Sequence, residues 1–170
     1  DLLFKIESLI ELSGNTIQTV RRIAHQLRPI ILDDLGLIPA LEWMIKNFNE
    51  NTDISWQLKL GFSVAEFNND FSLAAFRVVQ EAITNVIRHA DASSCLISLW
   101  SDEKYFFISI SDNGSGFDPK LIRDKGKLGL FGIEERIKPW KGDVNIESKK
   151  GKGCMVNVSF PKKLIIKTDD

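Results

Sequence analysis

The stretch "VVQEAITNVIRHA", from Val78 to Ala90, has the periodicity of a helix and an unusual polar face. At about 3.6 residues per turn, one stripe holds Glu81, Asn85, Arg88 and His89. The opposite, apolar stripe holds Val79, Ala82, Ile83, Val86, Ile87 and Ala90. A carboxylate, an amide, a guanidinium and an imidazole on one face are suited to a phosphate ligand and its metal ion. Taken alone, the stretch is also consistent with an amphipathic surface helix.

Each polar residue of this stripe has a candidate role. Mg²⁺ keeps most of its water ligands, so the amide oxygen of Asn85 would suffice beside phosphate oxygens. Arg88 and His89, one turn further on, could contact the phosphates. Glu81, one turn earlier, could orient or deprotonate the group that attacks a γ-phosphate.

A second candidate site is the octapeptide "SDNGSGFD", which follows an apolar strand and contains Asp112, Gly114 and Gly116. Because Asp, Asn and Gly are common turn residues, an ordinary strand exit is one interpretation. Alternatively, the glycines allow the backbone to approach a flat ligand. Asp112 would then accept a hydrogen bond from the exocyclic amine of adenine, whereas the carbonyl oxygen of guanine would repel it.

A third candidate site is "GKLGLFGIEER", in which Gly126, Gly129 and Gly132 lead into a predicted helix. Backbone N–H groups at the start of a helix form a natural phosphate site. A plain loop-to-helix turn would explain the same glycines, and the chain contains no Walker A motif.

The connection between Ser115 and Leu128 is long and cationic. Long connections often act as lids. Its basic residues would suit closure over phosphates or would simply aid solubility, and they are Lys120, Arg123, Lys125 and Lys127.

These sites lie at the junctions of a predicted α+β fold with a mixed sheet covered by helices. Residues 2–28 show apolar positions at alternating three- and four-residue steps, which predicts a long helix of a bundle or dimer. The pattern breaks at Pro29. Further helices are predicted over 38–50, 71–90 and 129–138, and strands over 54–60, 95–100, 105–111, 143–148 and 154–160. We place a domain boundary between residues 1–52 and 53–170.

Composition limits the class of protein. The 170 residues are 44% hydrophobic and 26% charged, which is typical of a globular domain. A net charge of −1 argues against nucleic acid as the main ligand. The two cysteines, Cys95 and Cys154, are too few for a disulfide scaffold and favour a reducing, cytoplasmic setting. Because the chain starts at Asp1 in helical periodicity, we interpret it as a piece of a longer protein.

Three motifs in this order carry a family resemblance. "QEAITNVIRHA", "DNGSGFD" and "GLFGIEER" resemble the N, G1 and G2 boxes of the histidine-kinase ATPase domain, the Bergerat or GHKL fold. "IAHQLRPIILDDLGLIPALEW" resembles the segment after the second dimerisation helix in sensor kinases of the nitrate-sensor-like subfamily. The resemblance covers nearly the whole chain. It implies an α/β sandwich preceded by a dimerisation helix.

The resemblance also implies a reaction and its participants. ATP with Mg²⁺ would lie between the long helix and the lid, and its γ-phosphoryl group would pass to a histidine and then to a response regulator. Asp112 would bind the adenine amine, Asn85 the Mg²⁺, and Glu81 would assist transfer. Further ATP contacts would come from Arg88, His89, Gly114, Gly116, Lys127, Gly129 and Gly132. Cys154 stands where the family often has a small hydroxyl residue near the adenine pocket.

The phosphoaccepting histidine is expected to lie outside this sequence. In the resembled family it is followed by an acidic residue, whereas His25 is followed by Gln26, and His89 belongs to the nucleotide motif. The full-length protein is expected to be a homodimer, and whether it is anchored in a membrane stays open. Two alternatives remain: another ATPase of the same superfamily, such as an anti-sigma serine kinase, or a nucleotide-binding scaffold without transfer.

Overall fold

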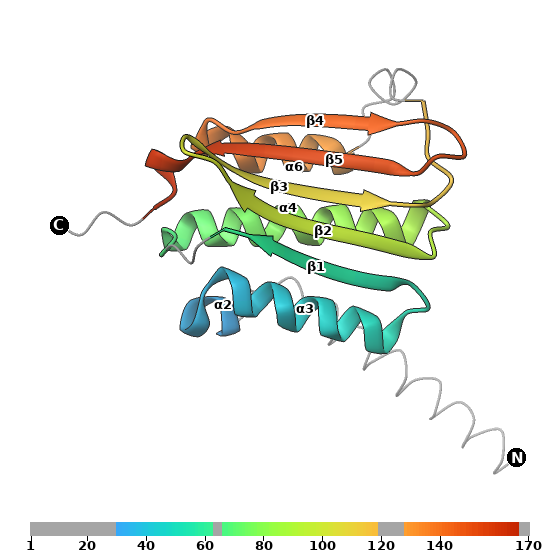
Figure 1. Ribbon diagram of the computed structural model, residues 1–170, viewed down its shortest axis with the longest axis horizontal. Coiled ribbons are helices and arrows are strands. Elements are labelled where there is room, and N and C mark those ends of the chain that lie inside the picture. The colour runs from blue at the N-terminus through green and yellow to red at the C-terminus, as the bar shows by residue number, and fades with distance from the viewer. Residues whose placement is uncertain (1–29, 63–65, 119–127, 167–170) are drawn as a thin grey trace, which may run out of the picture.

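The computed structural model describes residues 30–62, 66–118 and 128–166 (Figure 1). The predicted helix over residues 2–28 lies outside the described residues, and so do Gly126, Lys127 and the cationic part of the predicted lid. Every helix in the described ranges is too short or too polar to span a bilayer.

Apart from the short helix α2, the described helices and strands follow one another in the order that the sequence predicts. The helices are α2 (Ile30–Leu35), α3 (Leu37–Asn51), α4 (Asn69–His89) and α6 (Leu128–Ile137), with short 3-10 turns at Lys138–Trp140 and Lys162–Leu164. The strands are β1 (Ser55–Gly61), β2 (Ser94–Ser101), β3 (Tyr105–Asp112), β4 (Asp143–Ser148) and β5 (Cys154–Pro161).

The five strands form one mixed sheet in the order β1-β2-β3-β5-β4. β1 runs parallel to β2, and the other neighbouring pairs are antiparallel. In Figure 1, α4 lies behind β2 and β3, α6 lies behind β4 and β5, and α3 lies beside β1. The predicted α+β class, with helices covering a mixed sheet, is therefore confirmed.

The core lies between the sheet and α4, and its middle is aromatic. Phe71 of α4 is fully buried, and its ring contacts those of Phe106 (6.0 Å between centroids), Phe160 (4.9 Å) and Trp140 (5.4 Å). Edge-to-face pairs of this kind stabilise beyond their buried area. Along β2, Cys95, Ile97 and Leu99 are buried and the residues between them are half-buried, whereas on β3 Ile108, Ser109 and Ile110 are all buried.

α4 begins at a side-chain cap and buries most of its predicted apolar stripe. The Asn68 side-chain oxygen accepts hydrogen bonds from the N–H groups of Asp70 (2.8 Å) and Phe71 (3.4 Å). Val79, Ala82, Ile83 and Val86 are buried. Ile87 was expected among them, but it is 41% exposed, because it lies about 100° round the helix from the middle of the buried stripe.

The region before residue 53 differs from the sequence interpretation in one element. The helix α2 was not predicted, because it has only six residues and follows a proline. A helix this short depends on packing rather than propensity, and its Leu32 is buried in the core. Leu41 and Met44 of α3 belong to that core as well. The domain boundary after residue 52 stays a prediction.

Candidate functional site

Asp112 lies at the end of β3, on the sheet face that packs against the helices. Its register partners are Cys95 of β2 and Cys154 of β5. Residues that are directly paired across antiparallel strands point to the same face. The carboxylate is therefore flanked by a thiol on each neighbouring strand, at the end of the sheet where β3 stops (Figure 1).

The turn after β3 fixes the carboxylate. Asp112 is half-buried, and its Oδ1 accepts a hydrogen bond from the Gly114 N–H (2.8 Å). Asn113 ties the turn to β2, because its Oδ1 accepts hydrogen bonds from the N–H groups of Ser93 (3.0 Å) and Ser94 (2.9 Å). Asp112 Oδ2 has no hydrogen-bond partner among the described residues. One oxygen is thus held by the protein and the other is available to a ligand.

The glycines of this turn allow backbone to pack on backbone. A Cβ on Gly114 would overlap the carbonyl group of Ala90, at the end of α4. Gly116, at φ +57°, would overlap the carbonyl oxygen of Lys149 in the same way. From the sequence these glycines had two interpretations, an ordinary strand exit or a close approach to a flat ligand. The structure shows that the close neighbour is the chain itself.

Gly153 is a residue of this site that the sequence analysis did not single out. It has φ +76°, and a Cβ there would overlap the carbonyl oxygen of Asp112. The sequence signal was the pair of glycines in "KKGKG", which connects the two strands predicted over 143–148 and 154–160. That glycine allows the β4–β5 hairpin to close directly over the end of β3.

Four hydrogen bonds join α4, the turn and the hairpin. The Ser115 N–H donates to the Ala90 carbonyl (2.6 Å), and the Gly151 N–H donates to the Ser115 carbonyl (2.6 Å). The Ser148 hydroxyl accepts from the Phe117 N–H (2.9 Å) and donates to the Gly153 carbonyl (2.9 Å). The Asp112 end of the site is thus a rigid part of the fold.

Both thiols beside Asp112 are held in the neutral form. Burial, and secondly the charge of Asp112, raise the pKa of Cys95 to about 12. The same two causes raise the pKa of Cys154 to about 11. Cys154 lies beside Asp112, where the family resemblance placed it. Cys95 was not predicted as a neighbour, because the β2–β3 register was unknown.

The four predicted residues of the polar stripe of α4 lie within about 100° round the helix. Glu81, Asn85 and Arg88 lie within about 60° of one another round the helix, whereas His89 lies about 80° from Glu81. Glu81 and Asn85 are half-buried, and Arg88 and His89 are exposed. None of the four side chains has a hydrogen-bond or ion-pair partner among the described residues.

The stripe approaches the Asp112 turn at the end of α4. Ala90, the C-cap of α4, contacts Gly114 and Ser115. At about 1.5 Å per residue, Asn85 lies roughly 7.5 Å before Ala90 along the helix axis, and Glu81 roughly 13.5 Å. The order along α4 is therefore the one that a nucleotide would need if its base were at Asp112 and its phosphates at Asn85.

Arg77 adds a positive charge at the Glu81 end, and the sequence analysis did not include it. Arg77 lies one turn before Glu81, and its Nη1 donates a hydrogen bond to Gln80 Oε1 (2.6 Å). Burial, and secondly the charge of Arg136 on α6, lower the pKa of Arg77. Two guanidinium groups thus lie close together between α4 and α6.

Of the two described glycines of α6, Gly129 fits the predicted helix-start position and Gly132 does not. α6 begins at Leu128, so Gly129 is its second residue and Gly132 its fifth. Only the first four N–H groups of a helix lack an internal partner, so the Gly132 N–H is not part of a helix-start phosphate site. A Cβ on Gly132 would meet no described atom within 4 Å.

A metal cluster made of protein side chains is absent from the described residues. No three His, Cys, Asp or Glu side chains among them come together in a way that could hold an ion. The predicted Mg²⁺ site needs no such cluster, because it combines one amide oxygen with phosphate oxygens and water.

The part of the chain that contains this site matches a known protein family. Residues 72–164 match the family described as histidine kinase-, DNA gyrase B-, and HSP90-like ATPase. The match spans more than half of the chain, and the chain therefore belongs to this family of ATPases. ATP is accordingly the ligand that the family implies for this domain.

Two curated relatives narrow the similarity to sensor histidine kinases. The chain is 36% identical over 161 residues to the signal transduction histidine-protein kinase/phosphatase DegS of Brevibacillus brevis, covering 95% of this chain and 42% of DegS. It is 36% identical over 166 residues to the sensor histidine kinase MctS of Rhizobium johnstonii, covering 95% of this chain and 35% of MctS. The chain thus spans less than half the length of either relative. The predicted resemblance to histidine kinases is confirmed, and the nitrate-sensor-like subfamily stays a prediction.

Solved structures show the same fold. The Acinetobacter baumannii histidine kinase AdeS superposes with a TM-score of 0.60 at 18% identity, covering 95% of this chain and 84% of that chain. The histidine kinase domain of the Erythrobacter litoralis EL346 blue-light activated histidine kinase gives a TM-score of 0.55 at 18% identity, covering 74% and 58%. At this level of identity the likeness establishes the fold alone.

Proposed function

We propose that this chain is the ATP-binding catalytic part of a two-component sensor histidine kinase. It transfers the γ-phosphoryl group of ATP to a histidine outside this sequence, and the phosphoryl group then passes to an aspartate of a response regulator in the cytoplasm. The ATPase family and the names of the two relatives support this proposal. The observation that carries it is the Asp112 carboxylate, held at the end of β3 with one oxygen free of described partners.

At the base end of the site, Asp112 accepts a hydrogen bond from the adenine amine. Gly114 holds Oδ1, so Oδ2 is directed by the turn rather than by the ligand. A preorganised acceptor loses little freedom on binding. Neutral Cys95 and Cys154 line the carboxylate on both sides, and they add contact without adding charge.

At the phosphate end, Asn85 is the ligand that would hold Mg²⁺. Its amide is half-buried and has no described partner, which fits a group that completes its contacts with an ion. Mg²⁺ supplies charge neutralisation on the phosphate oxygens when it is bound. Glu81, one turn earlier on the same stripe, orients or deprotonates the attacking histidine.

The remaining predicted residues close the site around the phosphates. Arg88 and His89 are exposed at the end of α4 and supply positive charge or hydrogen bonds to them. Gly129 and Gly132 of α6, with Lys127 before it, belong to the segment that covers the nucleotide. Gly114 and Gly116 serve the site by fixing the turn around Asp112.

The first 52 residues are proposed to belong to the dimerisation region, and residues 53–170 to the ATPase domain. Neither histidine of this chain is the proposed phosphoacceptor. His89 lies on the nucleotide stripe of α4, and His25 lacks the acidic residue that follows the acceptor in the resembled family. The full-length protein is proposed to act as a homodimer.

A transfer assay between two polypeptides tests the proposal. The chain is incubated with γ-labelled ATP, Mg²⁺ and a separate polypeptide that carries the first dimerisation helix with its histidine. Label is expected on the second polypeptide. Glu81→Gln and Asn85→Asp should each lower the rate about 10²- to 10³-fold, as expected for loss of a general base or a metal ligand.

The matched control is Glu103→Gln, which makes the same chemical change at an exposed residue between β2 and β3. It should transfer at the wild-type rate. Acid-labile label on His25 or His89 of the chain itself would contradict the assignment of the acceptor. Transfer that survives both Glu81→Gln and Asn85→Asp would contradict the assignment of the site.

A further inference from the structure

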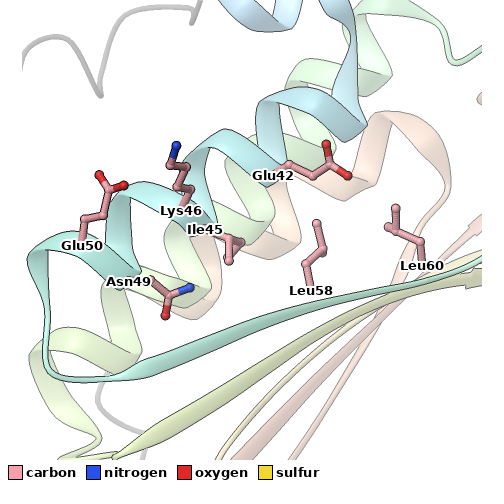
Figure 2. Close-up of a pocket in the computed structure, with 7 residues that line it drawn as sticks. All are labelled: Glu42, Ile45, Lys46, Asn49, Glu50, Leu58 and Leu60. Atoms are coloured by element: carbon pink, nitrogen blue, oxygen red, sulfur yellow. The ribbon is translucent and has the colours of Figure 1, made fainter.

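A hollow on the described surface lies away from the nucleotide site, between α3 and β1. It is a cavity of about 500 Å³. Figure 2 shows Ile45 and Asn49 pointing from α3 toward β1, and Leu58 and Leu60 pointing from β1 toward α3. Asp112 and the polar stripe of α4 are not among its lining residues. The cavity is therefore separate from the nucleotide site.

β1 is an edge strand of the sheet, with β2 as its neighbour on one side. Along a strand, the backbone N–H and C=O groups of successive residues point alternately to the two sides. The Ser55 N–H donates to the Ser93 carbonyl (3.0 Å), which directs Ser55 toward the β2 side. The alternate residues Trp56, Leu58 and Leu60 therefore direct their backbone groups outward.

The side chain of Asn49 on α3 hydrogen-bonds to the outward backbone groups of Trp56, the first of these residues. Its Nδ2 donates to the Trp56 carbonyl (2.9 Å), and its Oδ1 accepts from the Trp56 N–H (2.9 Å). A side-chain amide thus makes the two hydrogen bonds that a neighbouring strand would make at this residue. The edge at Trp56 is closed.

The next two outward residues are open. The backbone groups of Leu58 and Leu60 that face away from β2 have no partner among the described residues. The Leu60 side chain is 44% exposed. Exposed edges are usually protected by proline, bulges, covering segments or charged side chains, and of these "LKLG" carries only the single charge of Lys59. Open backbone groups beside a cavity to which Ile45, Leu58 and Leu60 contribute apolar side chains match the requirements of an added strand.

The charges on the rim indicate which segment would fit. Glu42 precedes Asn49 by two helical turns, about 10.5 Å, which brings it level with Leu58 and Leu60 rather than Trp56. In Figure 2 its carboxylate lies on the Leu58–Leu60 side of the cavity. Glu50 and Lys46 complete the charged rim, which is acidic on balance. A basic side chain on the occupant would therefore be favoured.

We infer that the β1 edge at Leu58 and Leu60 is a docking site for an extended segment of a partner protein. The segment would pair with β1 as an additional strand. Two apolar side chains at alternate positions would enter the cavity against Ile45, and a lysine or arginine of the segment would face Glu42. Binding of this segment would not require ATP.

A designed peptide serves as the probe. It is an acetylated and amidated octapeptide in which valine and threonine alternate, with one lysine near its end. It is titrated into the isotopically labelled full chain while amide resonances are followed by NMR. The expected result is saturable shifts at the Leu58 and Leu60 amides and hydrogen exchange at both that slows at least fivefold when peptide is bound.

Two altered peptides and three variants define the mode of binding. N-methylation at alternate residues, tried in both registers, should weaken binding about tenfold or more in one register, because it removes hydrogen bonds to β1. Leu60→Pro removes an outward N–H and should weaken binding similarly. Glu42→Lys should weaken it about fivefold. Lys59→Ala, on the same strand but outside the cavity lining, should leave binding unchanged.

The inference is overturned by any of three results. The first is an absence of shifts at Leu58 and Leu60 with millimolar peptide. The second is binding that N-methylation in neither register weakens. The third is a concentration-dependent dimer, detected by sedimentation, that buries this edge, since the occupant would then be a second copy of the chain.

Discussion

At the Asp112 end of the nucleotide site, backbone packs directly on backbone, whereas beside Gly132 of α6 no described atom comes close to the Cβ position. Gly114 lies against Ala90, and Gly153 lies against Asp112 itself. Gly132 on α6 has no described atom within 4 Å of the position where its Cβ would be. Glycine thus serves the fold on one side of the site, while on the other side the fold gives it no reason to be glycine.

The polar side chains follow the same division. Around Asp112, hydrogen bonds of the turn engage Asn113 and Ser148. On α4, Glu81 and Asn85 have no described partner. Substitutions at the Asp112 end should therefore lower stability together with binding, whereas substitutions of Glu81 and Asn85 on α4 should lower the reaction with ATP with little loss of stability.

The largest expected effect on stability is that of Gly153→Ala. The new Cβ would overlap the Asp112 carbonyl oxygen at a left-handed φ of +76°. Overpacking and backbone strain together should lower the free energy of unfolding by about 3 kcal/mol or more in urea titrations. Gly151→Ala is the matched control, because Gly151 has φ +75° but open space around its Cβ position. If both variants lost the same stability, the close packing would have no energetic role.

The next effect concerns the hydroxyl that joins the turn to the hairpin. Ser148→Ala removes a hydrogen bond from the Phe117 N–H and one to the Gly153 carbonyl. The expected loss is about 1–2 kcal/mol of unfolding free energy. Ser98→Ala, on the open face of the sheet, should cost less than about 0.5 kcal/mol. Equal losses for the two serines would contradict the special role of Ser148.

The smallest effect on stability, with the opposite sign, is expected at α6. Gly132→Ala should stabilise the chain by up to about 1 kcal/mol, because alanine favours a helix and meets no described atom. Its affinity for Mg·ATP should fall if the covering segment or the phosphates approach this position. Thermal unfolding without ATP measures the change in stability, and the increase in melting temperature on adding Mg·ATP measures the change in affinity. Destabilisation as large as that of Gly153→Ala would remove the contrast between the two sides.

Much of the fold could be predicted because its signals are local. The strand-forming residues of "CLISLW" and "YFFISIS" predicted β2 and β3, and the glycines of "KKGKG" lie between the two strands predicted over 143–148 and 154–160. The helix α2 could not be predicted, since a six-residue helix is stabilised by contacts from distant parts of the chain.

The site was predicted as a set of residues but not as a structure. Asp112 and Cys154 were expected near each other through the family resemblance. Cys95 completes the group only because of the β2–β3 register, which no local pattern reveals. The glycines in the sequence indicated positions without room for a side chain, but not that Ala90 and Asp112 lie where those side chains would be. These neighbours come from distant parts of the sequence, so only the three-dimensional structure identifies them.

Calorimetric titration of the chain with Mg·ATP and Mg·GTP tests the central claim most directly. The account predicts saturable heat with ATP and at least tenfold weaker binding of GTP, since the guanine carbonyl would face the Asp112 carboxylate. Asp112→Asn keeps an acceptor for the Gly114 N–H, so the fold should persist while ATP affinity falls about tenfold to 100-fold. Equal affinity of wild type and Asp112→Asn for ATP would contradict the account.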